Sequence, residues 1–200
     1  GFRCGFLGPL HMEIVQERLE REFDMNLITT CPNVNYQVYT KNGELLQVNN
    51  PSDMPEQGDI DTINEPFIKA EIISPAEFIG SIMKLCMSKR GIYRSTNYLS
   101  TNKVQLIFDM PLGEIIYDFF EKLKSTSKGY ASFDYEITEN QNGELVKLDV
   151  RIAGEIVDAL SIIVHKDNAY RQGSSLCKKL KDEIHRQQFE IPIQAAIGSK

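Results

Sequence analysis

The chain lacks any long apolar run. None of its segments approaches the roughly 18 consecutive apolar residues that a membrane-spanning helix requires. Its start carries neither a basic leader nor an apolar signal core. We therefore expect no integral membrane segment, and a cytoplasmic location is the default.

Motifs for metal, disulfide or nucleotide chemistry are missing as well. The cysteines, Cys4, Cys31, Cys86 and Cys177, lie far apart without a Cys-x-x-Cys pair. This spacing argues against a zinc site and a secreted disulfide framework, so we expect reduced, mostly buried thiols. The phosphate-loop pattern Gly-x-x-x-x-Gly-Lys-Ser/Thr is absent, and the three histidines fit no metal-ligand spacing. No catalytic, cofactor or metal site is therefore predicted in this chain.

What the chain does contain is an uneven distribution of charge. Its 200 residues include 28 acidic and 22 basic side chains, for a net charge of −6. Residues 1–66 carry 11 acidic and 4 basic side chains, whereas residues 67–143 carry 9 of each and residues 144–200 carry 8 and 9. The acidity is confined to the first third, so the remainder is compatible with local contacts to phosphate.

The first third is predicted to form a helix and a hairpin. Apolar residues recur at helical spacing over residues 10–23, which indicates an amphipathic helix. The Asn42-Gly43 pair favours a tight hairpin turn. Residues 49–65, rich in Asn, Asp, Pro and Glu, are predicted to be a linker. Extended stretches are predicted over residues 27–30, 34–40 and 45–48.

Residues 66–139 have the pattern of an α+β domain. The predicted order is strand 67–73, a helix from 74 to about 91, strands 92–98 and 103–109, helix 113–125 and strand 130–137. Ser74 and Glu77 form a capping box that would start the first helix, and Gly91 suits its end. This order predicts a ferredoxin-like split βαβ fold (βαββαβ), with both helices on one face of an antiparallel sheet. In its second half the residues expected to face the core are Ile116, Phe119, Phe120, Leu123, Ala131, Phe133, Tyr135 and Ile137.

The last section is predicted to be a second α+β unit. A turn is expected at residues 140–143, where Asn and Gly gather. After it we predict strands 145–152 and 157–164, a helix over 168–186 and an extended stretch over 189–197.

Three stretches of the chain resemble the LepA, or elongation factor 4, family of translational GTPases. They are GFRCGFLGPLHME at 1–13, LKSTSKGYASFDYE at 123–136 and VDALSIIVH at 157–165. The resemblance implies the end of a domain III over residues 1–48, a partial α/β remnant, and a linker over 49–65. It implies a domain like domain V of elongation factor G over 66–139, and the truncated start of a LepA-specific C-terminal domain over 144–200. Because the chain begins without methionine inside a glycine-rich motif, we expect it to be a piece of a longer protein.

The resemblance also implies a function. The chain would be the ribosome- and tRNA-docking portion of a GTPase that acts on elongating ribosomes, back-translocating tRNAs in the service of translational fidelity. A role in ribosome assembly, or a protein-interaction module without RNA contact, are the alternatives. GTP and Mg²⁺ would bind the G domain of the longer protein, so hydrolysis by this chain alone is not expected. The implied partners are ribosomal RNA, tRNA and that G domain, in the cytoplasm with peripheral association at the inner face of the cell membrane.

The candidate RNA contacts fall in two places. The family resemblance favours the loop Ser127, Lys128 and Gly129 as a contact to RNA backbone. A second cluster lies at a predicted strand-to-helix junction, where exposed N–H groups attract phosphate. It comprises His165, Lys166, Tyr170 and Arg171, with Lys178 and Lys179 further along the helix. A solvated helix face balanced by acidic neighbours is the alternative for this cluster.

The octamer at residues 128–135 nearly matches the RNP1 signature of RNA-recognition motifs. RNP1 belongs on a central strand before the second helix, whereas this octamer follows the second helix. Only Tyr130 is expected on the open face of the sheet, so a structural strand is the preferred interpretation over base stacking.

Overall fold

The chain separates into two compact units, residues 1–32 and 33–200. The computed structural model describes residues 4–7, 9–27, 29, 34–116, 118–185 and 189–198. The first unit contains the helix α1 (Pro9–Phe23), which confirms the predicted amphipathic helix. An ion pair one turn apart, Arg18–Glu22 at 2.9 Å, lies on its exposed side. The extended stretch expected over 27–30 lies partly outside the described residues, and Leu27 and Thr29 belong to no helix or strand.

One long strand, β3 (Ile60–Pro75), organises the second unit. Its first residues pair with a hairpin, and the rest pairs with two other strands on opposite edges. The described residues form a six-stranded antiparallel sheet that adds β1 (Tyr36–Thr40), β2 (Leu45–Val48), β4 (Ile92–Ser100), β5 (Lys103–Pro111) and β6 (Ser132–Asn142). The β1–β2 hairpin is confirmed, and Gly43 at φ 84° supplies the left-handed conformation that its turn needs.

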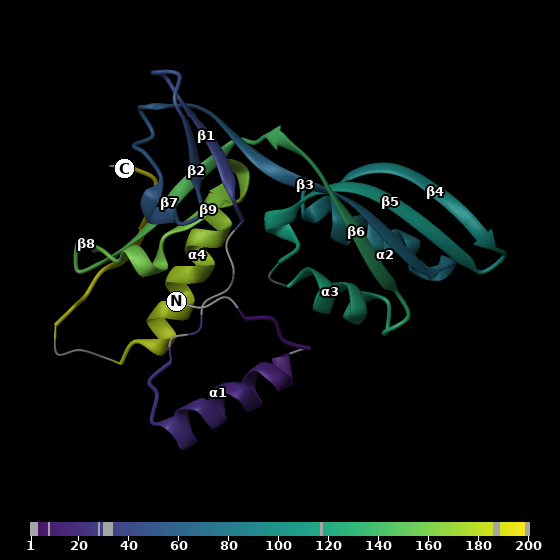
Figure 1. Ribbon diagram of the computed structural model, residues 1–200, viewed down its shortest axis with the longest axis horizontal. Coiled ribbons are helices and arrows are strands. Elements are labelled where there is room, and N and C mark those ends of the chain that lie inside the picture. The colour runs from purple at the N-terminus through teal and green to yellow at the C-terminus, as the bar shows by residue number, and fades with distance from the viewer. Residues whose placement is uncertain are drawn as a thin grey trace. The chain divides into compact units, whose positions relative to one another are not determined.

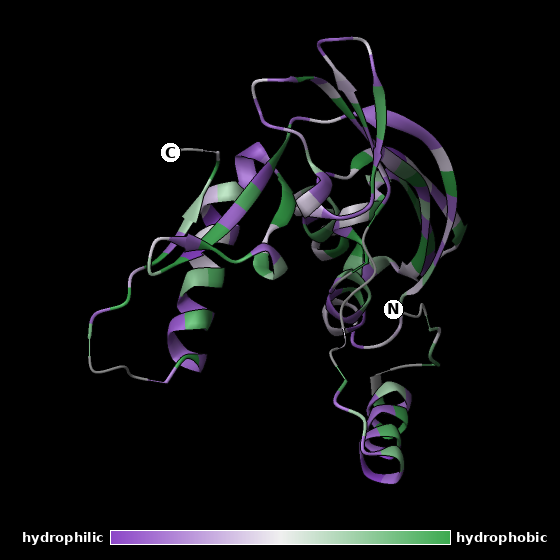
Figure 2. Cartoon of the chain, turned by 60° about the vertical axis from the view of Figure 1, so that its left-hand side comes forward, coloured by the Kyte–Doolittle hydropathy of each residue, from purple (hydrophilic) through white to green (hydrophobic). Residues whose placement is uncertain are grey.

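Strands β3 to β6 and two helices make the predicted ferredoxin-like arrangement. The helices are α2 (Ile79–Ser88), entered through the 3₁₀ turn η2 (Ala76–Phe78), and α3 (Phe119–Thr126), which follows the 3₁₀ turn η3 (Leu112–Glu114). Strand order β6-β3-β5-β4 and antiparallel pairing throughout are those of the split βαβ fold. Figure 1 shows α2 and α3 on the same side of this sheet. Their shared core includes fully buried Ile68, Ile72, Leu106, Phe108 and Phe119. Hydrophobic and hydrophilic residues alternate along the long strands (Figure 2).

The predicted capping box at Ser74 is wrong. Ser74 and Pro75 remain in β3, paired with Val104 and Lys103 of β5. The side chain of Ser74 is buried and donates its hydroxyl hydrogen to the carbonyl of Pro75 at 3.2 Å rather than accepting a helix N–H. Ser74 and Pro75 therefore pair with β5, although the sequence pattern assigns them to the helix.

The second helix is shorter than predicted. The segment expected to begin it at residue 113 forms η3 and a turn, and α3 starts at Phe119. Gly113 is a poor helix former, and Ile115 beside it is buried in the core. Phe120, expected to face inward, is 52% exposed, because the short helix buries Phe119 and Leu123 instead.

The inward face of β6 is only partly covered. Ala131 is fully buried and Phe133 packs against the core, as expected. Tyr135 and Ile137 are 46% and 68% exposed, so their assignment to the core is wrong. They lie on the edge strand β6, beyond the part of the sheet that α3 covers.

A second sheet is built around β7 (Leu145–Ile152). Its partners are β8 (Glu155–Ile156), β9 (Ile162–His165) and β10 (Ile193–Ala196). The helix α4 (Lys166–Glu183) packs beside β7 and β9 (Figure 1), through a core that includes Val146, Leu148, Val164 and Ala169. The predicted strand 157–164 is broken by the 3₁₀ turn η4 (Asp158–Leu160), which is closed by the Ser161 N–H donating to Asp158 O at 3.1 Å.

Two segments expected to be irregular are strands. Only the first part of the predicted linker 49–65 is irregular, with a 3₁₀ turn η1 (Pro51–Asp53), because β3 already begins at residue 60 and buries Ile63. The turn expected at 140–143 is wrong, since β6 continues to Asn142 by pairing with Asn64 to Pro66. The hairpin assigned with the domain III segment at 1–48 pairs with β3, so it shares a sheet with the ferredoxin-like part. Within the described residues no helix is long and apolar enough to cross a membrane.

Candidate functional site

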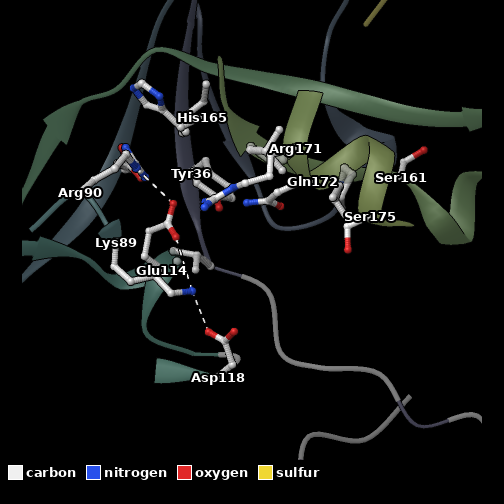
Figure 3. A pocket seen from close by; sticks show the side chains of 18 of the residues that line it. Tyr36, Lys89, Arg90, Glu114, Asp118, Ser161, His165, Arg171, Gln172 and Ser175 are labelled. Atoms are coloured by element: carbon white, nitrogen blue, oxygen red, sulfur yellow. Dashed lines mark hydrogen bonds and ion pairs between the residues drawn. The ribbon is translucent and has the colours of Figure 1, made fainter. Parts of the chain in front are cut away.

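A cleft of about 450 Å³ lies between the ferredoxin-like part and the corner where β9 enters α4 (Figure 3). Charged side chains from β3, from the residues just after α2, and from η3 to the first turn of α3 line one side. Polar side chains from the residue before β9, from β9 and from α4 line the other. The principal polar residues are Glu65, Lys89, Arg90, Glu114, Asp118 and Lys122 on the first side, and Ser161, His165, Arg171, Gln172 and Ser175 on the second.

Glu65 and Arg90 form the most buried ion pair of the cleft. Arg90 Nη1 donates to Glu65 Oε1 at 2.6 Å and Nη2 donates to Oε2 at 2.8 Å. The side chain of Glu65 is only 3% exposed, and a Cβ at Gly143 would lie 2.3 Å from its Oε1. A bidentate pair of this kind is strong because both carboxylate oxygens and two guanidinium nitrogens are engaged. Because Gly143 has no side chain, the carboxylate of Glu65 can occupy this space.

Arg90 adopts an unusual backbone conformation. Its φ is 58°, in the left-handed region that glycine usually fills after a helix. The following Gly91 donates its N–H to Cys86 O at 2.8 Å and closes the end of α2. A left-handed non-glycine residue costs on the order of 1 kcal/mol, which the side-chain ion pairs of Arg90 offset. An arginine therefore occupies a position where backbone preference alone would favour glycine.

Ion pairs continue from Arg90 to the start of α3. Arg90 Nε donates to Glu114 Oε1 at 3.2 Å, and Lys89 Nζ donates to Asp118 Oδ1 at 2.7 Å (Figure 3). Lys122 forms a further ion pair with Asp118. Every carboxylate in this chain of contacts has a basic partner, so the network holds α2, β3 and α3 together.

The network shifts two pKa values. Burial alone would lower the pKa of Arg90, but the hydrogen bonds and charges of Glu65 and Glu114 outweigh it and raise that pKa. Burial would raise the pKa of Asp118, whereas the hydrogen bonds and charges of Lys122 and Lys89 lower it overall. Both groups are therefore held in their charged forms.

The opposite wall of the cleft offers hydrogen-bond donors. His165 caps α4, since its Nδ1 accepts from the N–H of Asp167 at 3.3 Å. Arg171 Nη2 donates to Asn168 Oδ1 at 3.1 Å, and among the described residues no carboxylate pairs with its guanidinium. Figure 3 shows Arg171 and Gln172 reaching from α4 toward the space that Glu114 faces from the other side. This wall therefore suits an anionic group better than the opposite wall, where the basic and acidic groups neutralise each other.

Of the three residues in the predicted loop contact, one is buried and two are exposed. Ser127 is fully buried, donates its hydroxyl hydrogen to Leu123 O at 2.8 Å and accepts the N–H of Ala131 at 3.0 Å. Its hydroxyl is therefore committed to the fold. Lys128 and Gly129 are exposed and both have positive φ, at 51° and 86°. Only these two residues of the loop present groups to a partner.

The second predicted cluster is brought together at one end of α4. Lys166, Tyr170 and Arg171 are exposed within two turns of the helix start, and Tyr170 is 88% exposed. Lys178 and Lys179 are exposed about two turns later on the same helix. Of the predicted cluster, His165 and Arg171 line the cleft.

The acids that line the cleft are paired with bases, as described above. Within the described ranges no group of three or more His, Cys, Asp and Glu residues could hold a metal ion. The hydrogen-bond donors on the α4 side of the cleft suit an anionic partner.

Comparison with known proteins places the chain in a family. Residues 62–151 match the family model of the elongation factor G C-terminus, and residues 152–200 match that of the C-terminus of the GTP-binding protein LepA. Proteins named elongation factor 4 match over the whole chain, at 56% identity in Halalkalibacterium halodurans, 58% in Flavobacterium johnsoniae and 60% in Bacteroides fragilis. The chain belongs to the elongation factor 4 family. It spans about a third of the length of these curated relatives, 33% to 34%.

The two matched segments of this elongation factor 4 family chain meet within β7. The first match ends at Arg151 and the second begins at Ile152, the last residue of that strand. The ferredoxin-like part lies in the first match, and α4 with its exposed basic residues lies in the second. The family expected from the resemblance is therefore confirmed.

Sequence reasoning missed the ion-pair network. Glu65 lies in a polar stretch predicted to be a linker, and Arg90 precedes a glycine expected to end a helix. The one available signal was Gly91. Helices commonly end at a left-handed glycine, but Gly91 lies one residue beyond that position, so Arg90 takes the left-handed conformation.

Proposed function

We propose that this chain is a ribosome- and tRNA-docking portion of a translational GTPase that acts on elongating ribosomes and returns tRNAs to their earlier positions. The observation that carries the proposal is the similarity of the whole chain to proteins named elongation factor 4. GTP would be bound and hydrolysed by another part of such a protein, and the docking portion would act in the cytoplasm.

The exposed groups at the start of α4 supply the contacts that this proposal needs. Lys166 and Arg171 provide positive charge, and Tyr170 provides an exposed ring beside them. Arg171 is available because, within the described part of the chain, only an amide oxygen of Asn168 accepts from it. Guanidinium groups bind phosphate oxygens bidentately, and exposed aromatic rings stack on unpaired bases. Together they form an RNA-facing corner, which we define as Lys166, Tyr170 and Arg171.

The ion-pair network would position this corner. The network anchors α2 and α3 on one side of the cleft, and α4 forms the other side. Because the network charges neutralise each other, they add little attraction for RNA of their own. Their contribution is a fixed geometry, which reduces the entropy lost when the corner binds.

Co-sedimentation of this chain with ribosomes at several salt concentrations tests the proposal. Affinity should fall as salt rises, because phosphate contacts release counterions. A Lys166→Ala/Arg171→Ala variant should bind more weakly and show a salt slope smaller by about 2. The matched control is Lys84→Ala, which removes an exposed charge from α2.

The outcomes separate the alternatives. An affinity for ribosomes that changes neither with salt concentration nor with the double substitution would contradict RNA docking and favour a protein-interaction module. Binding that is restricted to immature ribosomal subunits would contradict action on elongating ribosomes and favour a role in assembly.

A further inference from the structure

A second cleft, of about 430 Å³, lies against the face of β7 opposite α4. Its volume falls within the range of small-molecule sites. Its walls come from the segment between η1 and β3, from β8 and from the backbone near Gly198. The lining residues are Met54, Pro55, Glu56, Gln57, Gly58, Ile60, Lys147, Asp149, Arg151, Ile156 and Gly198.

Three charged residues of β7 form the floor of this cleft. Lys147, Asp149 and Arg151 alternate along the strand and therefore point to the same side. Asp149 is 10% exposed, and its Oδ1 accepts from Lys147 Nζ at 3.1 Å and from Ser161 Oγ at 2.7 Å. The carboxylate is thus satisfied by its neighbours.

Arg151 has no such partner in the ranges that the structure describes. Within these ranges its Nε is buried without a hydrogen-bond acceptor, and its guanidinium forms no ion pair. A buried donor left unpaired costs about 1–3 kcal/mol, and more when the group is charged. Unpaired buried donors are rare in folded proteins. The Nε itself is covered, so an acceptor from outside the chain would reach the guanidinium on the side where Arg151 lines the cleft.

The remaining walls suggest what carries that acceptor. Met54, Pro55, Ile60 and Ile156 are apolar, and Glu56 and Gln57 can accept hydrogen bonds. The two basic groups are balanced by two carboxylates, Asp149 and Glu56, so the cleft has no excess charge to attract a bare anion. A ligand with one anionic group and a flat, partly apolar body matches these walls better.

We propose that this cleft, the β7 cleft, binds one unpaired nucleotide of RNA. Arg151 and Lys147 contact its phosphate, and the apolar walls hold its base while Glu56 or Gln57 accepts from an exocyclic amino group. The choice of RNA as the source of the nucleotide rests on the proposed function. The site is separate from the RNA-facing corner, because no residue of that corner lines it.

Nuclear magnetic resonance of the ¹⁵N-labelled chain tests the cleft directly. The Nε–Hε signal of Arg151, assigned by its loss in Arg151→Lys, is followed during titration with AMP, adenosine and inorganic phosphate. AMP should shift this signal further, at lower concentration, than either of the others. No shift with AMP would overturn the proposal. An equal response to phosphate would also overturn it, by showing an anion site that ignores the base.

Ribosome co-sedimentation then separates this inference from the proposed function. Arg151→Ala should weaken binding about tenfold, the effect of losing one charge-assisted contact, whereas Arg94→Lys, at an exposed ion pair with Asp109, should not. If Arg151→Ala binds like the unsubstituted chain while Lys166→Ala/Arg171→Ala binds weakly, the β7 cleft is not used and RNA docking stands. If the unsubstituted chain does not bind ribosomes, the proposed function fails, and the AMP titration still decides whether the cleft takes a nucleotide. Amide spectra of each variant establish that β7 remains folded.

Discussion

The guanidinium of Arg90 meets the carboxylate of Glu65 through two parallel hydrogen bonds of 2.6 and 2.8 Å, at the point where β3 passes from the hairpin into the ferredoxin-like sheet. The pair joins the end of α2 to a strand 25 residues earlier in the chain. Because Glu65 also contacts the position of Gly143, three segments meet at one carboxylate. The stability of the cleft should depend on this group.

Replacement of Glu65 tests that dependence. Glu65→Ala leaves Arg90 charged and without its main partner, so we expect a loss of about 3–5 kcal/mol in the free energy of unfolding. Urea denaturation followed by circular dichroism gives the value. Glu139→Ala removes an exposed carboxylate from β6 and should change the free energy by less than about 0.5 kcal/mol. Similar losses in both variants would contradict a structural role for the pair.

Two glycines near the ends of α2 should respond in opposite directions to alanine. A Cβ at Gly91 would lie 2.7 Å from Cys86 O, a backbone atom that cannot move aside easily. We expect Gly91→Ala to destabilise the chain by about 1–3 kcal/mol. A Cβ added at Gly80 would have no atom within 4 Å, so Gly80→Ala should stabilise the chain by about 0.5–1 kcal/mol. The melting temperatures of the two variants should therefore lie on opposite sides of that of the unsubstituted chain.

Thiol reactivity should distinguish Cys86 from Cys4. Burial raises the pKa of Cys86 to about 12, so its thiolate is scarce at neutral pH. Iodoacetamide at pH 8 should modify the exposed Cys4 and leave Cys86 unmodified until urea unfolds the chain. Peptide mass spectrometry gives the extent at each site. Rapid modification of Cys86 in the folded chain would show that α2 does not pack as described.

Acid should weaken the cleft partly through Asp118. Its folded pKa lies below the ordinary value, so its ion pairs stabilise the folded chain above the unfolded pKa of about 3.9. This contribution is lost as the pH falls through the folded pKa. Asp118→Asn should therefore be less stable at pH 7 and show a smaller further loss below about pH 4. Denaturation midpoints measured from pH 7 down to pH 2 test the sign, and an unchanged acid limb would contradict it.

The parts of the fold with strong local signals could be predicted from the sequence. Alternating apolar residues located the central strands, and Asn42-Gly43 located the hairpin, because these signals depend on neighbouring residues alone. The errors came where pairing with a distant strand overrode the local signal. Ser74 pairs with β5 instead of capping a helix, and Asn140 to Asn142 pair with β3 instead of forming a turn.

The candidate site was harder to predict. The exposed residues at the start of α4 could be named, since charge and a strand-to-helix junction are visible in a sequence. The partners of Arg90 could not, because Glu65 and Glu114 lie 25 and 24 residues away. The unpaired state of Arg151 gave no signal, since the sequence pattern around it is that of an ordinary exposed position on an alternating strand.

The short connection between β6 and β7 has a mechanical consequence. β6 ends at Asn142 and β7 begins at Leu145, so only two residues join the sheet of the ferredoxin-like part to the sheet beneath α4. Two residues, one of which is Gly143 against the side chain of Glu65, are too few to form a long flexible linker. A displacement of either sheet relative to the other must therefore be accommodated within these two residues and their contact with Glu65.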